Sequence, residues 1–100
     1  MKAFLIDPQQ QTIDPVDVTN IDDIKQLIRF DTVIRDEIGP DGDRLYFDEE
    51  CFLRGTEGRF QIDSIVPVAG KGVVVGGKEG DVLQDVVTDA AALKGRLKYL

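Results

Sequence analysis

The sequence predicts a single α+β domain spanning residues 1–100, in which a mixed, mainly antiparallel sheet of about five to seven strands packs on one main helix. Three observations predict this fold class. Short runs of β-branched and aromatic residues alternate with turns rich in Gly, Pro and Asp. One longer segment carries apolar residues at helical spacing. The length of 100 residues and the hydrophobic fraction of 42 % suit one core that folds without disulfides or metal.

Two strands open the chain. Lys2–Asp7 is a short apolar strand, and Thr12–Val18 alternates apolar with polar residues. The simplest pairing of these two strands is a hairpin. Because Pro15 cannot donate a ladder hydrogen bond, we expect it at a sheet edge, at a bulge or in an outward-facing position.

The main helix is predicted over Asn20–Phe30. Thr19 or Asn20 can cap its first turn, and the acidic residues that follow favour the positive end of the helix dipole. Apolar residues recur on one face of this segment, which should face the core. The residues expected to be buried there are Ile24, Leu27 and Ile28.

A second hairpin and a short connection follow. Thr32–Ile38 and Leu45–Phe47 are rich in strand-forming residues and flank a Gly-Pro-Asp-Gly turn. Cys51–Leu53 fits either one helical turn or an irregular connection, and the sequence leaves both open.

The second half of the chain continues with strands. Phe60–Val68 is predicted to be extended, although Pro67 interrupts it. Gly72–Gly76 is predicted to be a compact buried strand, with Val73 and Val75 in the core. Glycines at both ends mark the limits of that strand.

The chain is predicted to finish with a short helix and a strand. Thr88 can cap a helix over Asp89–Lys94, and Gly95 is expected to end it. Arg96–Leu100 then alternates polar with apolar residues, so its apolar side chains should face the core from one side of a strand.

The net charge of −7 is concentrated in the first half of the chain. Residues 1–50 hold 13 acidic and 5 basic residues, against 6 and 7 in residues 51–100. This acidity repels phosphate backbones, so nonspecific nucleic-acid binding is not expected. It favours either a basic partner protein or simply solubility.

Cysteine usage and the N-terminal residues indicate a cytoplasmic protein. Cys51 is the only cysteine, so no intramolecular disulfide can form and a reducing compartment is expected. Met1–Ile6 holds too few consecutive apolar residues for a signal peptide or a membrane span. We therefore expect no insertion into a membrane.

The chain has no histidine, which removes the commonest general base and the favoured nitrogen ligand of zinc. Cys51 then has no obvious activating base, and a structural thiol is expected. The segment from Gly72 to Lys78 matches the start of a phosphate loop, but Glu79 replaces the Ser or Thr that would hold magnesium. We therefore assign no catalytic residue, no metal ligand and no cofactor.

The densest acidic region surrounds the second predicted hairpin. Its candidates for an interaction surface are Asp41, Asp43, Asp48, Glu49 and Glu50. The spacing does not match a calcium loop, because Leu45 takes a ligand position and Tyr46 the position of the required glycine. Solvated turn carboxylates are the simpler alternative.

Four segments together resemble a family of small uncharacterised proteins of bacteria and phages. They are Met1–Pro8, Asp48–Gly55, Ala69–Gly76 and the basic-aromatic ending at Arg96–Leu100. Cys51 stands where that pattern has a glycine. The resemblance implies an accessory role in a bacterium or phage, and it implies neither an activity nor site residues.

Two classes of function remain open. The first is a noncatalytic interaction module that uses its acidic first half or an exposed sheet edge to bind a basic partner protein. The second is a small-ligand-binding protein or a cofactor-independent enzyme with an anion site near Gly70–Gly80. The contacts to that anion would come from Lys71, Lys78 and Glu79. A flat acidic face would favour the first class, and a pocket with converging polar groups would favour the second.

Overall fold

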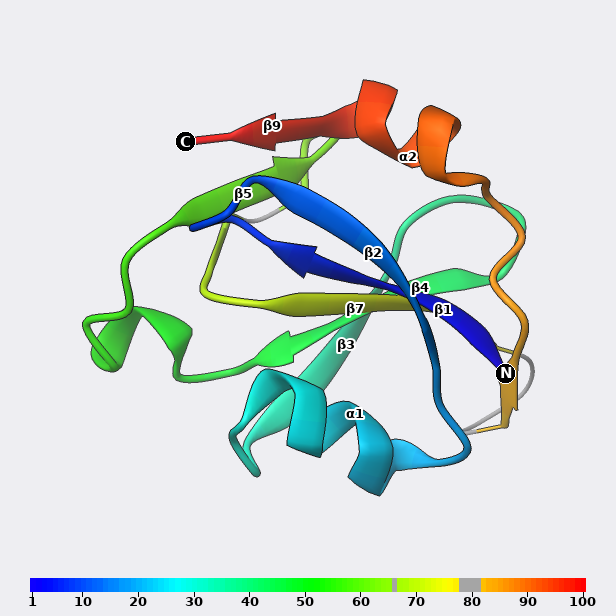
Figure 1. Ribbon diagram of the computed structural model, residues 1–100, viewed down its shortest axis with the longest axis horizontal. Coiled ribbons are helices and arrows are strands. Elements are labelled where there is room, and N and C mark those ends of the chain that lie inside the picture. The colour runs from blue at the N-terminus through cyan, green and yellow to red at the C-terminus, as the bar shows by residue number, and fades with distance from the viewer. Residues whose placement is uncertain (66, 78–81) are drawn as a thin grey trace.

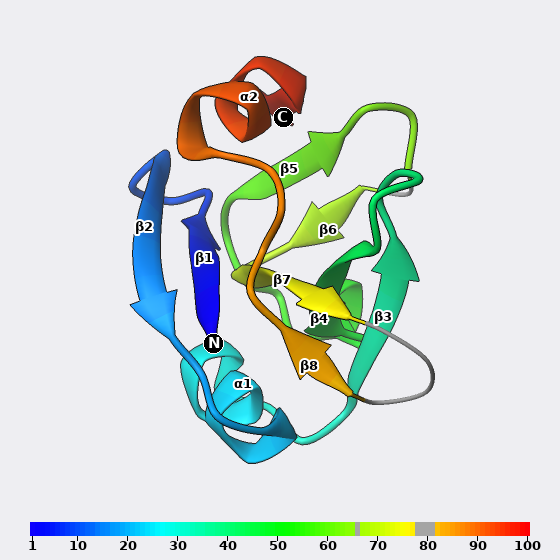
Figure 2. The same ribbon diagram turned by 90° about the vertical axis from the view of Figure 1, so that its right-hand side faces the viewer.

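Nine strands and two α-helices build the part of the protein described by a computed structural model, which is residues 1–65, 67–77 and 82–100. Helix α1 (Ile21–Ile28) covers one face of the larger of two sheets. The smaller sheet and helix α2 (Ala90–Arg96) cover the other face (Figure 1 and Figure 2). The predicted α+β class is therefore confirmed. Neither of these two helices is long and apolar enough to cross a membrane.

The larger sheet contains six strands. They are β1 (Lys2–Asp7), β2 (Thr12–Asp17), β3 (Val33–Glu37), β4 (Asp43–Asp48), β7 (Gly72–Gly77) and β8 (Leu83–Gln84). The order is β2-β1-β7-β4-β3, the pairing is antiparallel, and β8 pairs with the end of β7. Both predicted hairpins are confirmed, and Pro15 lies on the edge strand β2 as expected.

Helix α1 begins and packs largely as the sequence predicts. The Asn20 side chain accepts a hydrogen bond from the Asp23 amide at 3.0 Å, which confirms the cap. Ile24 and Ile28 are buried against the larger sheet beside β7. The sequence predicts a buried Leu27, but the structure shows it only half-buried. Ile24 and Ile28 form the centre of the buried helix face, and Leu27 lies at its margin.

The smaller sheet packs on the opposite face of the larger one. It contains β5 (Arg59–Ile62), β6 (Val68–Ala69) and β9 (Leu97–Tyr99), in the order β6-β5-β9. Phe60 is fully buried in the core between the two sheets. A Cβ atom on Gly72 would lie 2.7 Å from the Phe60 ring, so the start of β7 has room only for glycine.

A turn separates β5 from β6, where the sequence predicts one extended region over Phe60–Val68. Asp63 adopts a φ of 51° in this turn, and the Ile65 amide donates to the Ile62 carbonyl at 3.0 Å. Residue 66, which belongs to the predicted region, lies outside the described residues. Cys51–Leu53 forms a single 3-10 turn, η1, which is the helical one of the two alternatives.

The limits of α2 correct two predictions. Asp89 caps the helix instead of Thr88, because its carboxylate accepts a hydrogen bond from the Ala92 amide at 2.7 Å. Gly95 lies inside the helix and does not end it. The helix ends where Leu97 begins to pair with β5.

The predicted C-terminal strand is confirmed as β9. Leu97 and Tyr99 are half-buried against the core between the sheets. The Arg96 guanidinium, just before the strand, donates hydrogen bonds to the Ile38 carbonyl and to the Asp63 carboxylate, the latter at 2.6 Å. The hydrogen bond from Arg96 lowers the pKa of Asp63. Arg96 therefore ties α2 to two turns.

Candidate functional site

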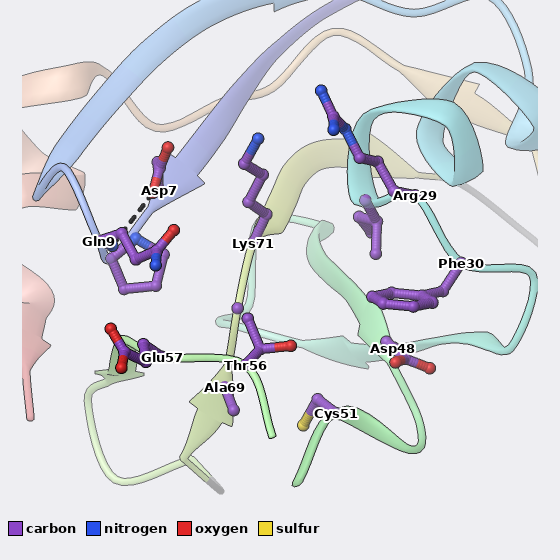
Figure 3. Close-up of a pocket in the computed structure, with 13 residues that line it drawn as sticks. Asp7, Gln9, Arg29, Phe30, Asp48, Cys51, Thr56, Glu57, Ala69 and Lys71 are labelled. Atoms are coloured by element: carbon purple, nitrogen blue, oxygen red, sulfur yellow. Dashed lines mark hydrogen bonds between the residues drawn. The ribbon is translucent and has the colours of Figure 1, made fainter. Parts of the chain in front are cut away.

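A pocket of about 250 Å³ opens beside the start of β7 (Figure 3). Three regions line it: the β1–β2 turn, the end of α1, and the segments that adjoin η1 and β6. These regions are far apart in the sequence. They meet because β7 lies between β1 and β4 in the sheet.

Arg29 reaches the pocket because α1 ends one residue before it. The residue adopts the left-handed conformation, with a φ of 73°, and its amide donates to the Lys25 carbonyl at 2.6 Å. Glycine usually occupies such a position, because a side chain there strains the backbone. Arg29 thus occupies a backbone conformation that is strained for any residue with a side chain, and from there its side chain reaches the pocket.

Lys71 lies between Gly70 and the first residue of β7. Gly70 has a φ of 78°, and its amide donates to the Gly58 carbonyl at 3.0 Å. Gly58 packs so closely on the β1–β2 turn that a Cβ atom would lie 2.9 Å from the Gln9 nitrogen. These two glycines hold the backbone around Lys71, whose side chain extends on the same side of the pocket as Arg29 (Figure 3).

Asp7 stands at the other end of the same rim, with Lys71 between it and Arg29 (Figure 3). Its Oδ1 accepts hydrogen bonds from the amides of Gln9 at 3.1 Å and Gln10 at 3.3 Å, which holds the β1–β2 turn. Its Oδ2 has no hydrogen-bond partner among the residues that the structure describes.

Five apolar or weakly polar residues form one wall of the pocket. They are Ile28, Phe30, Cys51, Thr56 and Ala69. Cys51 is a free thiol and only 4 % exposed. The guanidinium of Arg54 lies 4.2 Å from the centre of the Phe30 ring and holds this wall in place.

Asp48 also lines the pocket, but internal contacts occupy it. Its carboxylate accepts hydrogen bonds from Arg54 Nε at 2.9 Å, from the Glu50 amide at 3.1 Å and from the Thr32 hydroxyl. Burial alone would raise the pKa of Asp48, but these hydrogen bonds and the charge of Arg54 lower it below its ordinary value. Asp48 is therefore ionised and paired at neutral pH.

The two cations of the pocket, Arg29 and Lys71, are not paired in this way. Neither side chain forms a hydrogen bond or an ion pair with any other residue in the described ranges. Two such cations on one rim can bind an anionic group through charge-assisted hydrogen bonds.

The five acidic residues predicted as an interaction surface do not share one face. Asp43 and Asp48 lie at opposite ends of β4 and are 4 % and 2 % exposed. The Asp43 carboxylate accepts the Val87 and Thr88 amides at 2.8 Å and 2.9 Å, so it is structural, like Asp48. The exposed members are Asp41, Glu49 and Glu50.

The alternative anion site near Gly70–Gly80 is placed only in part. Lys71 lies in the pocket, whereas Lys78 and Glu79 lie outside the described residues. No sequence pattern singles out Arg29, because only some helices end in a left-handed residue, and α2 ends at an extended one. No three potential metal ligands gather anywhere in the described parts of the chain.

Comparison with protein families, curated proteins and solved structures finds no match to this chain. The resemblance to small bacterial and phage proteins therefore stays a prediction.

Proposed function

We propose that this protein is a noncatalytic small-ligand-binding protein that holds a carboxylate between Arg29 and Lys71. The observation that carries the proposal is the presence, on one rim of a pocket with an apolar wall, of two cations that have no partner among the described residues (Figure 3). Such a pocket supports the second of the two functions that the sequence leaves open. The acidic residues give less support to the first, because Asp43 and Asp48 are used internally.

The size of the pocket limits the ligand to a small molecule. Its volume of about 250 Å³ lies below the roughly 300–1,000 Å³ of pockets for drug-sized ligands. A water molecule takes about 30 Å³ of the liquid, so this volume equals that of roughly eight waters. A ligand with a handful of non-hydrogen atoms therefore fits.

The expected affinity is weak. A hydrogen bond to a charged group contributes about 1.5–3 kcal/mol, and a carboxylate could accept one from each cation. The Ile28 and Phe30 side chains add apolar contact. Association also has an entropic cost, which opposes these contacts. We therefore expect a dissociation constant in the millimolar range, which corresponds to a binding free energy of about −4 kcal/mol.

The pocket supports binding better than catalysis. Cys51 is its only thiol, and its side chain forms no hydrogen bond with a described residue that could activate it. A buried thiol that no neighbouring group activates is a poor nucleophile.

Isovalerate, a small carboxylate, serves as the probe of the proposed site. Arg29→Gly is expected to abolish binding of isovalerate while making the protein more stable. The substitution removes one of the two cations and relieves the left-handed strain at a φ of 73°. We expect the free energy of unfolding to rise by about 1 kcal/mol, or roughly 4–8 °C in Tm. Calorimetric titration with sodium isovalerate and thermal unfolding measure the two effects. Loss of binding in a more stable protein cannot be attributed to misfolding.

Lys71→Gln should weaken isovalerate binding about tenfold or more, and Lys98→Gln is the matched control. Lys98 is exposed on β9 and does not line the pocket, so the same loss of charge there should leave the affinity unchanged. Equal affinities for the parent protein, Arg29→Gly and Lys71→Gln would refute the proposal. Failure of the parent protein to bind isovalerate at tens of millimolar would refute it as well.

A further inference from the structure

The pocket contains acids as well as cations, and their charges cancel. Arg29 and Lys71 contribute two positive charges. Asp7 and Glu57 contribute two negative charges. The negative charge of Asp48 is balanced by Arg54, whose Nε lies 2.9 Å from its carboxylate. The lining therefore offers a ligand both signs of charge and no net charge.

The end of α1 adds partial negative charge to the pocket. Ile28 is the last residue of the helix and lines the pocket. The last carbonyl groups of a helix carry a partial negative charge of about half an elementary charge. Together with Oδ2 of Asp7, which no described residue hydrogen-bonds, this end disfavours a ligand with two negative charges. It favours a ligand that carries a positive group beside its negative one.

We propose that the ligand is a small zwitterion, an α-amino acid with a small apolar side chain. This inference rests on the proposed function, since the carboxylate binds between Arg29 and Lys71. The ammonium group donates to Oδ2 of Asp7, which lies beyond Lys71 on the same rim (Figure 3). The side chain of the amino acid packs against the apolar wall at Ile28.

Three compounds of nearly the same shape test the contributions of the two charged groups of the ligand separately. L-Valine carries both the carboxylate and the ammonium group, isovalerate lacks the ammonium group, and isobutylamine lacks the carboxylate. We expect valine to bind about tenfold more tightly than isovalerate, because it adds one charge-assisted hydrogen bond. Isobutylamine should bind more weakly than valine, because Arg29 and Lys71 then have no anion to contact. Calorimetric titration at fixed ionic strength measures all three.

Asp7→Asn tests the role of the carboxylate without removing the turn. An asparagine Oδ1 can still accept the amides of Gln9 and Gln10, which Asp7 binds at 3.1 Å and 3.3 Å. The variant should bind valine only about as tightly as it binds isovalerate, because the ammonium group loses its charged acceptor. Asp17→Asn is the matched control, because Asp17 is exposed on β2 and does not line the pocket.

The outcomes distinguish this inference from the proposed function. If isovalerate and valine bind equally and Asp7→Asn changes neither affinity, the inference of a zwitterionic ligand is wrong, whereas the proposed carboxylate site is retained. If neither compound binds, or both bind independently of Arg29 and Lys71, the proposed function is wrong and this inference falls with it. A preference for valine over isovalerate that disappears in Asp7→Asn and persists in Asp17→Asn supports both the zwitterionic ligand and the proposed function.

Discussion

Replacing Phe60 with alanine is expected to lower the free energy of unfolding by about 3–5 kcal/mol. Phe60 is fully buried between the two sheets, and the missing side chain of Gly72 leaves space for its ring. Because glycine stands opposite the ring, the start of β7 offers no side chain to fill the space that alanine would leave. For a domain with a stability of about 5–15 kcal/mol, the loss is large. Urea denaturation, with the midpoint and slope compared with those of the parent protein, measures it.

Phe52→Ala is the matched control for this experiment. Phe52 is 50 % exposed on η1, and the Arg59 guanidinium lies 5.4 Å from the centre of its ring. The same chemical change at this surface position should cost less than about 1 kcal/mol. Equal losses in the two variants would contradict a core centred on Phe60.

Asp48→Ala is expected to cost about 2–4 kcal/mol, although the change removes a negative charge from an acidic protein. The substitution leaves the Thr32 hydroxyl and the Glu50 amide without their acceptor. The loss should be smaller than the 3–5 kcal/mol typical of a broken buried pair, because Arg54 is 31 % exposed and can be hydrated. Glu49→Ala, next to it and exposed, should stay within about 0.5 kcal/mol.

The contribution of Asp48 should also depend on pH. Its pKa is lowered in the folded protein relative to the ordinary value of about 3.9. Its stabilising contribution is therefore present above about pH 4 and is lost as the pH falls through the folded-state pKa. The difference in unfolding free energy between the parent protein and Asp48→Ala should shrink below about pH 4. A difference that stays constant between pH 7 and pH 3 would contradict the ionised pair.

Local patterns were sufficient to predict most elements of the fold. The alternation in Thr12–Val18 and the turn that precedes it specify the first hairpin, and Asn20 followed by acidic residues specifies the start of α1. The glycines around Val73–Val75 mark β7 because a buried strand needs β-branched residues between breakers. The insertion of β7 between β1 and β4 was not predictable, since it depends on long-range pairing.

Side chains whose partners lie far along the chain account for most of what the sequence could not predict. Asp43 resembles a solvated turn residue, but it binds amides 44 and 45 residues away. Gly95 is a typical helix end, yet the pairing of Leu97 with β5 decides where α2 stops. For the same reason, a pocket built from Asp7, Arg29 and Lys71 has no local signature.

The most direct test of the carboxylate site is to map where isovalerate binds. Amide proton–nitrogen correlation spectra of the labelled protein would be recorded with sodium isovalerate and, as the reference, with sodium chloride at the same ionic strength. We expect the largest shift changes at Arg29, Lys71 and Thr56, which line the pocket, and little change in β9. Saturable changes that cluster away from these residues, or no saturable change at all, would contradict the account.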